Sequence, residues 1–245
     1  MKLLSEPLVS EEAACPYLKD RKWRFSYFFA TEVDGEELNY ILSRGWRKFG
    51  MYYFKPVCRG CRECVPIRLN CDKLQAAKSQ KRVLRKCEDI RVEFRDLEYR
   101  DEIYELYRVH SLDRFGKESN VEDFQSSFYT PSCPAIQSEY YIGDRLAGVG
   151  FLDVSTEALS SVYFIYHTDF LKYSLGTFSI LRESAFAVSM GFRYYYLGYY
   201  IRENRSMAYK NSFHMNEKMD WLTGRWLDEI EFESCEKKIL SYPDN

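Results

Sequence analysis

YFKPVCRGCRECVPIRLNCDKLQAAKSQKRVLRK, residues 53–86, joins a cysteine array to a strongly basic segment. The array has C-x-x-C-x-x-C spacing and consists of Cys58, Cys61 and Cys64. From residue 44 to residue 86, thirteen Lys and Arg residues stand against two acids. Each phosphate that such a surface neutralises releases a counterion, so the stretch favours binding of a polyanion. The alternative is a solvated basic helix without a ligand.

The composition is that of a folded protein. The 245 residues carry a formal net charge of −2 and are 46% hydrophobic, which excludes a disordered chain. The 21 tyrosines indicate a polar ligand surface in addition to a core. No run approaches the ~18 apolar residues of a membrane span, and the first residues lack a cleavable apolar core. We therefore expect a cytoplasmic protein without membrane contact, whose eight cysteines are thiols or metal ligands.

Hydrophobic periodicity divides the chain into two units, residues 1–88 and 89–245. In the first unit we expect strands at 22–31 and 68–70, a hairpin at 46–56, and helices at 36–44 and 79–87. Ser79 would cap the second helix. The second unit predicts strands at 90–94, 138–142, 146–154, 159–167, 194–200 and 221–232, and helices at 101–115, 121–129, 176–190 and 202–213. The chain is therefore α+β. The element order of the second unit is that of a GNAT-like acyltransferase domain, preceded here by a smaller α+β domain that contains the cysteine array.

The cysteine array supplies three thiolates within one loop, which suits zinc or an iron–sulfur cluster. A fourth ligand would come from elsewhere, and the candidates are Cys15, Cys71 and Cys87. The alternative is that these cysteines are packed thiols, because a free cysteine behaves as a small hydrophobic residue.

Two further segments suggest ligand contacts. The loop 174–177 precedes a predicted helix, whose free amides at Gly176 and Thr177 could bind an anion. This loop lacks the several glycines expected for the pyrophosphate of coenzyme A, which argues for a different acyl donor. The tyrosine-rich strand 194–201 has Gly198 at its centre, which favours close approach of a ligand backbone, although pure core packing is the alternative.

These features together carry a resemblance to a known family. The matching pieces are Cys15-Pro16-Tyr17-Leu18, Phe54-Lys55-Pro56 with Cys58, Cys61 and Cys64, Val65-Pro66-Ile67-Arg68, Ser79-Gln80-Lys81-Arg82, Leu159 to Tyr163, Ser174 to Thr177, Tyr196 to Tyr199, and Met207-x-Tyr209-Lys210. In this order they resemble the bacterial aminoacyl-tRNA–protein transferases, the leucyl-transferring branch related to eukaryotic arginyltransferases. The resemblance implies transfer of leucine or arginine from a charged tRNA to proteins beginning with Asp or Glu, which marks them for degradation.

One departure from the family concerns the cofactor. Where the eukaryotic relatives have a second cysteine soon after the first, this chain has Leu18. The departure weakens the case for an iron–sulfur cluster, and Cys15, Cys58, Cys61 and Cys64 are kept as a candidate metal site. Transfer itself should require no cofactor, because an aminoacyl ester is already activated, and the α-amine can attack it directly.

The candidate site residues fall into three groups. The candidate catalytic residues are Asp153, Ser160, Ser161 and Tyr163: Asp153 would accept the proton of the amine or orient the amine, and the other three, on the partner strand, could face it. Arg68, Gln80 and Arg82 would bind the acidic N-terminal side chain, since a guanidinium matches a carboxylate. The tRNA and its aminoacyl end would contact Lys78, Lys81, Arg85, Lys86, Gly176, Thr177, Tyr196, Tyr199 and Lys210, and the basic residues of the last two groups could exchange roles.

Two other functions compete with this interpretation. A non-catalytic RNA-binding protein with a zinc knuckle would use the same basic helix and aromatic residues. An acetyl-coenzyme-A-dependent GNAT acetyltransferase would share the element order but would need the absent glycine-rich loop. For the preferred function we expect a monomer that binds aminoacyl-tRNA and a protein substrate.

Overall fold

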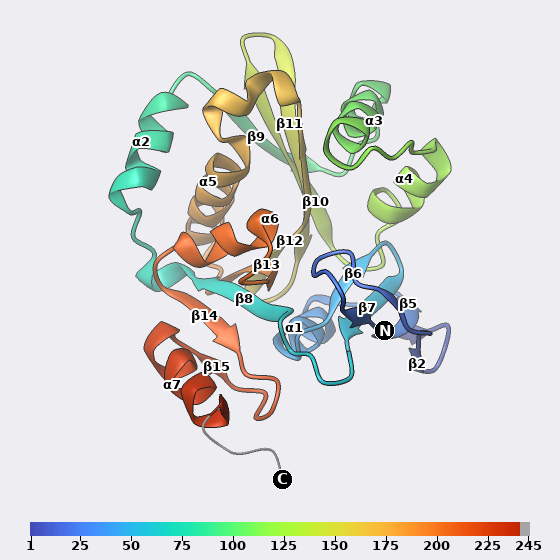
Figure 1. The fold of residues 1–245 in the computed structure, drawn as a ribbon. Coiled ribbons are helices and arrows are strands. Elements are labelled where there is room, and N and C mark those ends of the chain that lie inside the picture. The colour runs from blue at the N-terminus through green and yellow to red at the C-terminus, as the bar shows by residue number, and fades with distance from the viewer. Residues whose placement is uncertain (241–245) are drawn as a thin grey trace.

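The computed structural model describes residues 1–240 and confirms a mixed α+β chain. Its largest part is an eight-stranded sheet in the order β15-β14-β8-β13-β12-β11-β10-β9 (Figure 1). The strands are β8 (Val65–Asn70), β9 (Arg91–Asp96), β10 (Ala135–Ile142), β11 (Arg145–Val154), β12 (Ala158–Tyr166), β13 (Tyr194–Tyr200), β14 (Asn216–Met219) and β15 (Trp226–Leu227). The strand that follows the cysteine array, β8, therefore lies inside the sheet, between β14 and β13.

One pair of neighbouring strands departs from the antiparallel pattern of this sheet. β12 and β13 run parallel and pair at three positions, the last of which joins Ser160 to Tyr196. β12 continues to Tyr166 and β13 to Tyr200 without further pairing between them. The strands therefore diverge, and we call the region between residues 161–166 and 197–200 the β12/β13 split.

Helices cover both faces of the large sheet (Figure 1). α2 (Lys78–Lys86) packs on α5 (Leu175–Ser189) on one face, and α3 (Asp101–Phe115) and α4 (Val121–Phe128) lie on the other. On β11, Val149 and Phe151 pack with α3 and α4, whereas Leu152 lies in the cluster that contains Ile180 and Leu181 of α5. Successive side chains of a strand point to opposite faces, so a strand buried on both sides carries apolar residues on both faces.

The first 56 residues build a smaller sheet in the order β1-β5-β7-β6, with β2 also paired to β5. Its strands are β1 (Lys2–Leu3), β2 (Leu8–Val9), β5 (Phe25–Thr31), β6 (Arg47–Phe49) and β7 (Tyr52–Pro56), while β3 (Ala13–Ala14) and β4 (Lys22–Trp23) form a separate two-stranded sheet. Phe28 and Tyr53 of the small sheet pack in one core with Ala158 and Tyr196 of the large one. The two sheets therefore share apolar contacts where β12 and β13 are still paired.

The helix α1 (Gly35–Ser43) confirms the helix predicted at 36–44. Asp34 accepts hydrogen bonds from the amides of Glu36 and Glu37, and the Glu37 carboxylate accepts one from the Asp34 amide. This reciprocal pair satisfies free amides of the first turn. Gly45 follows the helix at φ 79°, a left-handed conformation that glycine adopts readily.

Three predicted elements were wrong in detail. The helix α2 begins at Lys78 with Ala77 as its N-cap, because the Gln80 side chain accepts the Ala77 amide at 2.8 Å, so Ser79 lies inside the helix. The region 202–213 is not one helix but a short α6 (Arg205–Ala208) followed by a 3-10 turn, η3 (Tyr209–Ser212).

The predicted closing strand at 221–232 is instead a hairpin followed by a helix. Asp220 accepts the amides of Leu222 and Thr223 and turns the chain between β14 and β15. Asp228 accepts the amide of Glu231 at 2.9 Å, which starts α7 (Glu229–Leu240). Local side-chain hydrogen bonds of this kind compete with a continuous strand. The remaining 3-10 turns are η1 (Cys71–Lys73) and η2 (Thr168–Tyr173).

The division into units at residue 88 stays a prediction, but the large sheet crosses it. β8 pairs with β13 and with β14, both from the second unit. None of the helices within residues 1–240 has the length and apolar character of a membrane-spanning segment.

Candidate active site at the β12/β13 split

Two basic side chains donate hydrogen bonds to the facing edges of the split. Arg47, from β6 of the small sheet, donates through Nη2 to the carbonyl of Ser161 on β12. Lys210, from η3, donates through Nζ to the carbonyl of Tyr199 on β13 at 3.1 Å. Three segments distant in sequence therefore converge where the sheet opens.

Gly198 provides the space in which these two side chains meet. It sits at a register shift between β13 and β8 and has φ 85°, a conformation that other residues rarely adopt. Gly198 is half-buried, whereas its neighbours Leu197 and Tyr199 are buried. A Cβ on Gly198 would lie 3.6 Å from Lys210 Nζ and 3.8 Å from Arg47 Nε, with no other non-neighbouring atom within 4 Å. The missing side chain therefore lets both cations approach the strand at this point.

The charge of this pair is not balanced within the protein. Arg47 is 9% exposed, and its Nη1 is buried without a hydrogen-bond partner among the described residues. Burial lowers the pKa of Arg47. Burial, and to a lesser extent the charge of Arg47, lowers the pKa of Lys210 to about 7. A basic pair in this state is suited to receiving a negative charge.

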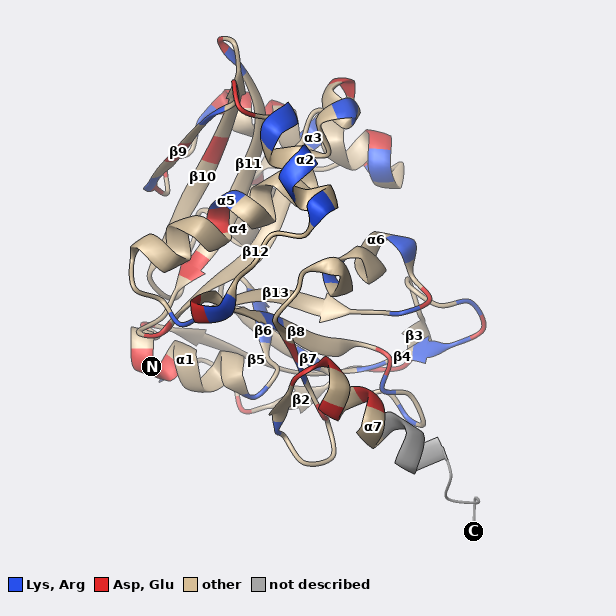
Figure 2. Ribbon diagram, turned by 90° about the vertical axis from the view of Figure 1, so that its left-hand side faces the viewer, with Lys and Arg blue, Asp and Glu red and all other residues tan. Residues whose placement is uncertain are grey.

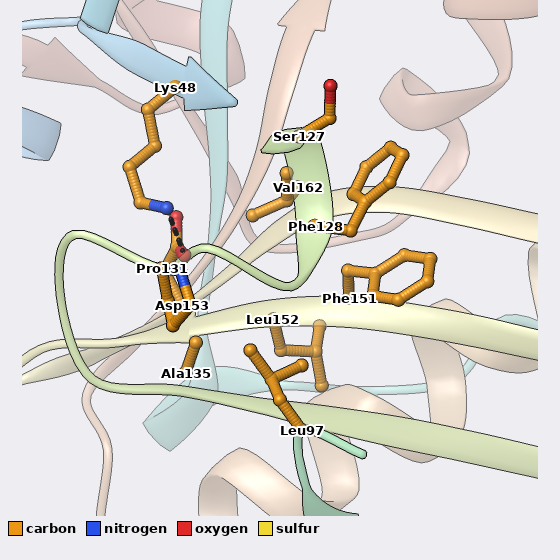
Figure 3. Close-up of a pocket in the computed structure, with 10 residues that line it drawn as sticks. All are labelled: Lys48, Leu97, Ser127, Phe128, Pro131, Ala135, Phe151, Leu152, Asp153 and Val162. Atoms are coloured by element: carbon orange, nitrogen blue, oxygen red, sulfur yellow. Dashed lines mark ion pairs between the residues drawn. The ribbon is translucent and has the colours of Figure 1, made fainter. Parts of the chain in front are cut away.

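The predicted base Asp153 lies in a different environment from the one expected. It forms an ion pair with Lys48 at 2.9 Å, and both side chains are almost fully buried (Figure 3). The Cys133 thiol lies 3.5 Å from its Oδ1. A carboxylate enclosed in this way has its charge compensated and does not face the split directly.

The other three predicted catalytic residues follow each other on β12. Ser160 pairs with Asp153 on one side and with Tyr196 on the other, and its buried hydroxyl has no partner among the described residues. Ser161 contributes its carbonyl to Arg47. Tyr163 stacks on Phe128 with ring centroids 5.7 Å apart, and burial raises its pKa. Ser160 and Ser161 thus lie at the start of the split, and Tyr163 packs against α4.

The three residues predicted to bind an acidic side chain are not brought together. Arg68 donates to Glu217 and, at 3.0 Å, to the hydroxyl of Tyr196, and its guanidinium lies over the ring of Tyr194. Gln80 is buried and donates to the carbonyl of Ser212 at 3.2 Å. Arg68 and Gln80 are therefore engaged within the protein.

The third of these residues, Arg82, is exposed on α2 with other basic residues. The basic side chains of this helix point away from the core: Lys78, Lys81, Arg82, Arg85 and Lys86. Figure 2 shows the resulting band of positive charge along α2. The hydrogen bond from Gln80 to Ser212 ties this helix to η3, which carries Lys210. The basic helix is therefore connected to the split through one turn.

The remaining predicted contacts divide between solvent and core. Gly176 lies in the first turn of α5, and nothing lies within 4 Å of where its Cβ would be. Thr177 beside it is half-buried. The hydroxyl of Tyr199 donates to the carbonyl of Gly45 at 2.9 Å, and that of Tyr196 accepts from Arg68. Both tyrosine hydroxyls thus hold the strand in place.

The cysteine array faces a cavity but does not form a ligand set. Cys58, Cys61 and Cys64 line a cavity of about 230 Å³ together with Trp221. Burial raises the pKa of Cys64 to about 12, and Cys58 accepts the amide of Arg24 at 3.3 Å. Among the side chains that the structure describes, no three of Cys, His, Asp or Glu are grouped closely enough to ligate one ion. A metal at Cys15, Cys58, Cys61 and Cys64 stays a prediction.

Arg47 is the residue of the split that the sequence does not single out. It lies in a hairpin strand beside Trp46 and Lys48, where basic residues are usually exposed. Its burial arises from the packing of the small sheet on β12, a contact between residues 114 positions apart. No local pattern announces such a contact.

Comparison with known proteins gives matches along most of the chain. The model described as "Arginine-tRNA-protein transferase, N terminus" matches residues 13–82, and the one described as "Arginine-tRNA-protein transferase, C terminus" matches residues 102–220. An aspartate/glutamate leucyltransferase of Campylobacter jejuni serotype O:6 is 34% identical, covering 91% of this chain and 96% of the relative. An aspartate/glutamate leucyltransferase of Helicobacter hepaticus is 32% identical, covering 83% of this chain and 88% of the relative.

Solved structures give weaker similarity. L-PGS from Bacillus licheniformis has a TM-score of 0.42 at 12% identity, covering 62% of this chain and 53% of that one. FemX has a TM-score of 0.44 at 8% identity, covering 66% of this chain and 59% of that one. At these scores the similarity does not establish a shared fold.

Proposed function

The chain belongs to the arginine-tRNA-protein transferase family, and we propose that it transfers leucine from leucyl-tRNA to the α-amine of proteins that begin with Asp or Glu. The observation that carries this proposal is the similarity to aspartate/glutamate leucyltransferases over 91% of the chain. It favours leucine over arginine as the donor, a choice that the residues alone leave open. The product would be a degradation signal on the modified protein.

The β12/β13 split is the proposed place of transfer. Two diverging parallel strands leave backbone groups unpaired, and basic side chains are already oriented toward them. This arrangement supports a GNAT-like acyltransferase domain, as does the element order of residues 89–245. The exposed cations of α2 would hold tRNA phosphates and so direct the aminoacyl end toward η3.

The reaction needs little from the protein beyond positioning. The α-amine nitrogen attacks the ester carbonyl carbon, the bond from that carbon to the ribose oxygen breaks, and the ribose hydroxyl takes up the proton that the amine loses. Because the ester is already activated, no covalent enzyme intermediate and no cofactor is required for transfer.

A transfer assay tests the proposal. The protein is incubated with leucyl-tRNA or arginyl-tRNA and with peptides that begin with Asp, Glu or Ala, and products are measured by mass spectrometry. We expect leucine on the Asp and Glu peptides and none on the Ala peptide. Binding of tRNA without any product would favour the RNA-binding alternative. Acetylation by acetyl-coenzyme A, or a rise in Tm with coenzyme A, would favour the acetyltransferase.

A further inference from the structure

Basic side chains outnumber acids around the split. Arg47 and Lys210 form no ion pair with any side chain that the structure describes. The one acid close to Arg47 is Asp153, whose charge is already matched by Lys48 at 2.9 Å. The other ionisable groups that face Arg47 are the hydroxyls of three buried tyrosines: Tyr195, Tyr196 and Tyr199. The pair therefore carries positive charge without an anion of its own.

Such a pair is unfavourable unless an anion joins it. A guanidinium cannot lose its proton in a protein, so Lys210 is the group that yields, and its pKa falls to about 7. In addition to this uncompensated charge, the Nη1 of Arg47 has no hydrogen-bond partner, and a buried donor without an acceptor is destabilising. A ligand that accepts hydrogen bonds and carries negative charge would relieve both.

We propose that Arg47 and Lys210 bind the side-chain carboxylate of the acceptor protein's N-terminal Asp or Glu, next to Gly198. This inference rests on the proposed function, which supplies an acceptor with that carboxylate. A planar guanidinium with a free nitrogen matches a carboxylate, and the ammonium supplies the second contact. Lys210 then belongs to the acceptor site rather than to the aminoacyl end of the tRNA.

The structure favours a carboxylate over a tRNA phosphate at this position. Gly198 lies beside two nitrogen atoms, each less than 4 Å from where a Cβ would be. Gly198 is itself half-buried, whereas the basic side chains of α2 extend into solvent. A small, terminal side chain fits such a site better than a polymer backbone.

The first experiment measures acceptor specificity. At saturating leucyl-tRNA, kcat/KM is determined for two peptides that differ only in their first residue, Asp or Asn. We expect Lys210→Met to lower kcat/KM for the Asp peptide about 10- to 100-fold, the usual effect of losing a charged hydrogen bond, with the loss expressed mainly in KM. The Asn peptide should change little. Lys117→Met, an exposed lysine beyond α3, is the matched control and should leave both values unchanged.

The outcomes separate the two proposals. A wild-type protein that transfers no leucine contradicts the proposed function itself. A wild-type protein that transfers leucine, with a variant that keeps the wild-type ratio of Asp to Asn, overturns the inference. An equal loss with both peptides and a higher KM for leucyl-tRNA would place a tRNA phosphate at the pair and also overturns it.

A second experiment measures binding without catalysis. The dipeptide Asp-Ala is titrated into the protein at pH 8 without tRNA, in buffers of different ionisation enthalpy. A carboxylate beside Lys210 raises the pKa of that lysine, so binding should take up protons. The uptake should exceed that of Lys210→Met, in which only the peptide amine can titrate, and Asn-Ala should show no such excess. Equal uptake by wild type and variant would contradict the proposal. Arg47→Lys, which keeps the charge, should bind Asp-Ala more tightly than Arg47→Gln.

Discussion

Glu183 of α5 is an acid in the core, held by hydroxyl groups. Ser138 donates to it at 2.7 Å and Tyr140 at 3.2 Å, and Tyr195 donates to its other oxygen. Gly150 leaves the room for this network, because a Cβ there would meet the Glu183 carboxylate. Burial outweighs the hydrogen bonds and raises the pKa of Glu183 to about 7.

Glu183 should make stability depend on pH. A carboxyl whose folded pKa is raised stabilises the protein while protonated, below its unfolded pKa, and this contribution is lost as pH rises through about 7. The side chain of Glu183→Gln cannot ionise. The free energy of unfolding of this variant should therefore rise relative to that of wild type between pH 5 and pH 8. The gain should be about 3 kcal/mol, because about two units of the shift from 4.5 to about 7 fall within this range and each is worth ~1.4 kcal/mol.

Urea unfolding at a series of pH values measures this difference. Glu88→Gln, at an exposed position, is the control and should follow the pH dependence of wild type. A constant difference between Glu183→Gln and wild type across the range would show that Glu183 does not titrate there.

At the scale of residues, the sequence indicates unusual side chains better than it indicates their partners. Asp153 stands out as an acid in an apolar strand, but its ion pair with Lys48 depends on a contact between two sheets. Lys210 is among the residues expected at the site and lies at the split, whereas Arg47 carries no local signal. The composition of the site is thus partly predictable, and its geometry is not.

The helix α2 makes a separable contribution to RNA binding. Its basic side chains extend into solvent, and its apolar side packs toward α5. Replacing Lys81 and Arg85 by Gln should weaken tRNA binding and flatten its salt dependence. The slope of log K against log salt concentration should fall by about 0.9 for each phosphate that the variant no longer neutralises.

Filter binding of tRNA at several salt concentrations gives both quantities. Lys117→Gln, at an exposed position shortly after α3, which lies on the opposite face of the large sheet from α2, should leave the slope unchanged. If the double variant keeps the wild-type slope, the basic helix does not hold phosphates. In either case the double variant should bind Asp-Ala as wild type does, since neither Lys81 nor Arg85 lies at the split.

At the scale of elements, most helices and strands of residues 89–200 follow from hydrophobic periodicity. The helix predicted at 101–115 has the bounds of α3. The errors concentrate where a short polar side chain sets the local structure: Gln80 caps α2, and Asp228 begins α7. An Asp three residues before Glu231 is a helix-start signal, and the aromatic residues around it favour a strand instead.

The whole molecule should unfold as one unit. β8 is buried along its full length between β13 and β14, and the small sheet shares a core with Ala158 and Tyr196. We expect one transition on heating, with coincident midpoints by circular dichroism and by tryptophan fluorescence. Two independent domains meeting near residue 88 would instead give two transitions. The pairing of β8 with β13 joins segments far apart in the chain, and periodicity alone cannot foresee it.

The hydrogen bond from Gln80 to Ser212 has a consequence for how the two substrates would cooperate. It couples the surface proposed for the nucleic acid to the turn proposed for the polypeptide. If docking of one partner changes the affinity for the other by some factor, thermodynamics requires the reverse effect to have the same size. Gln80→Leu would then diminish both effects together.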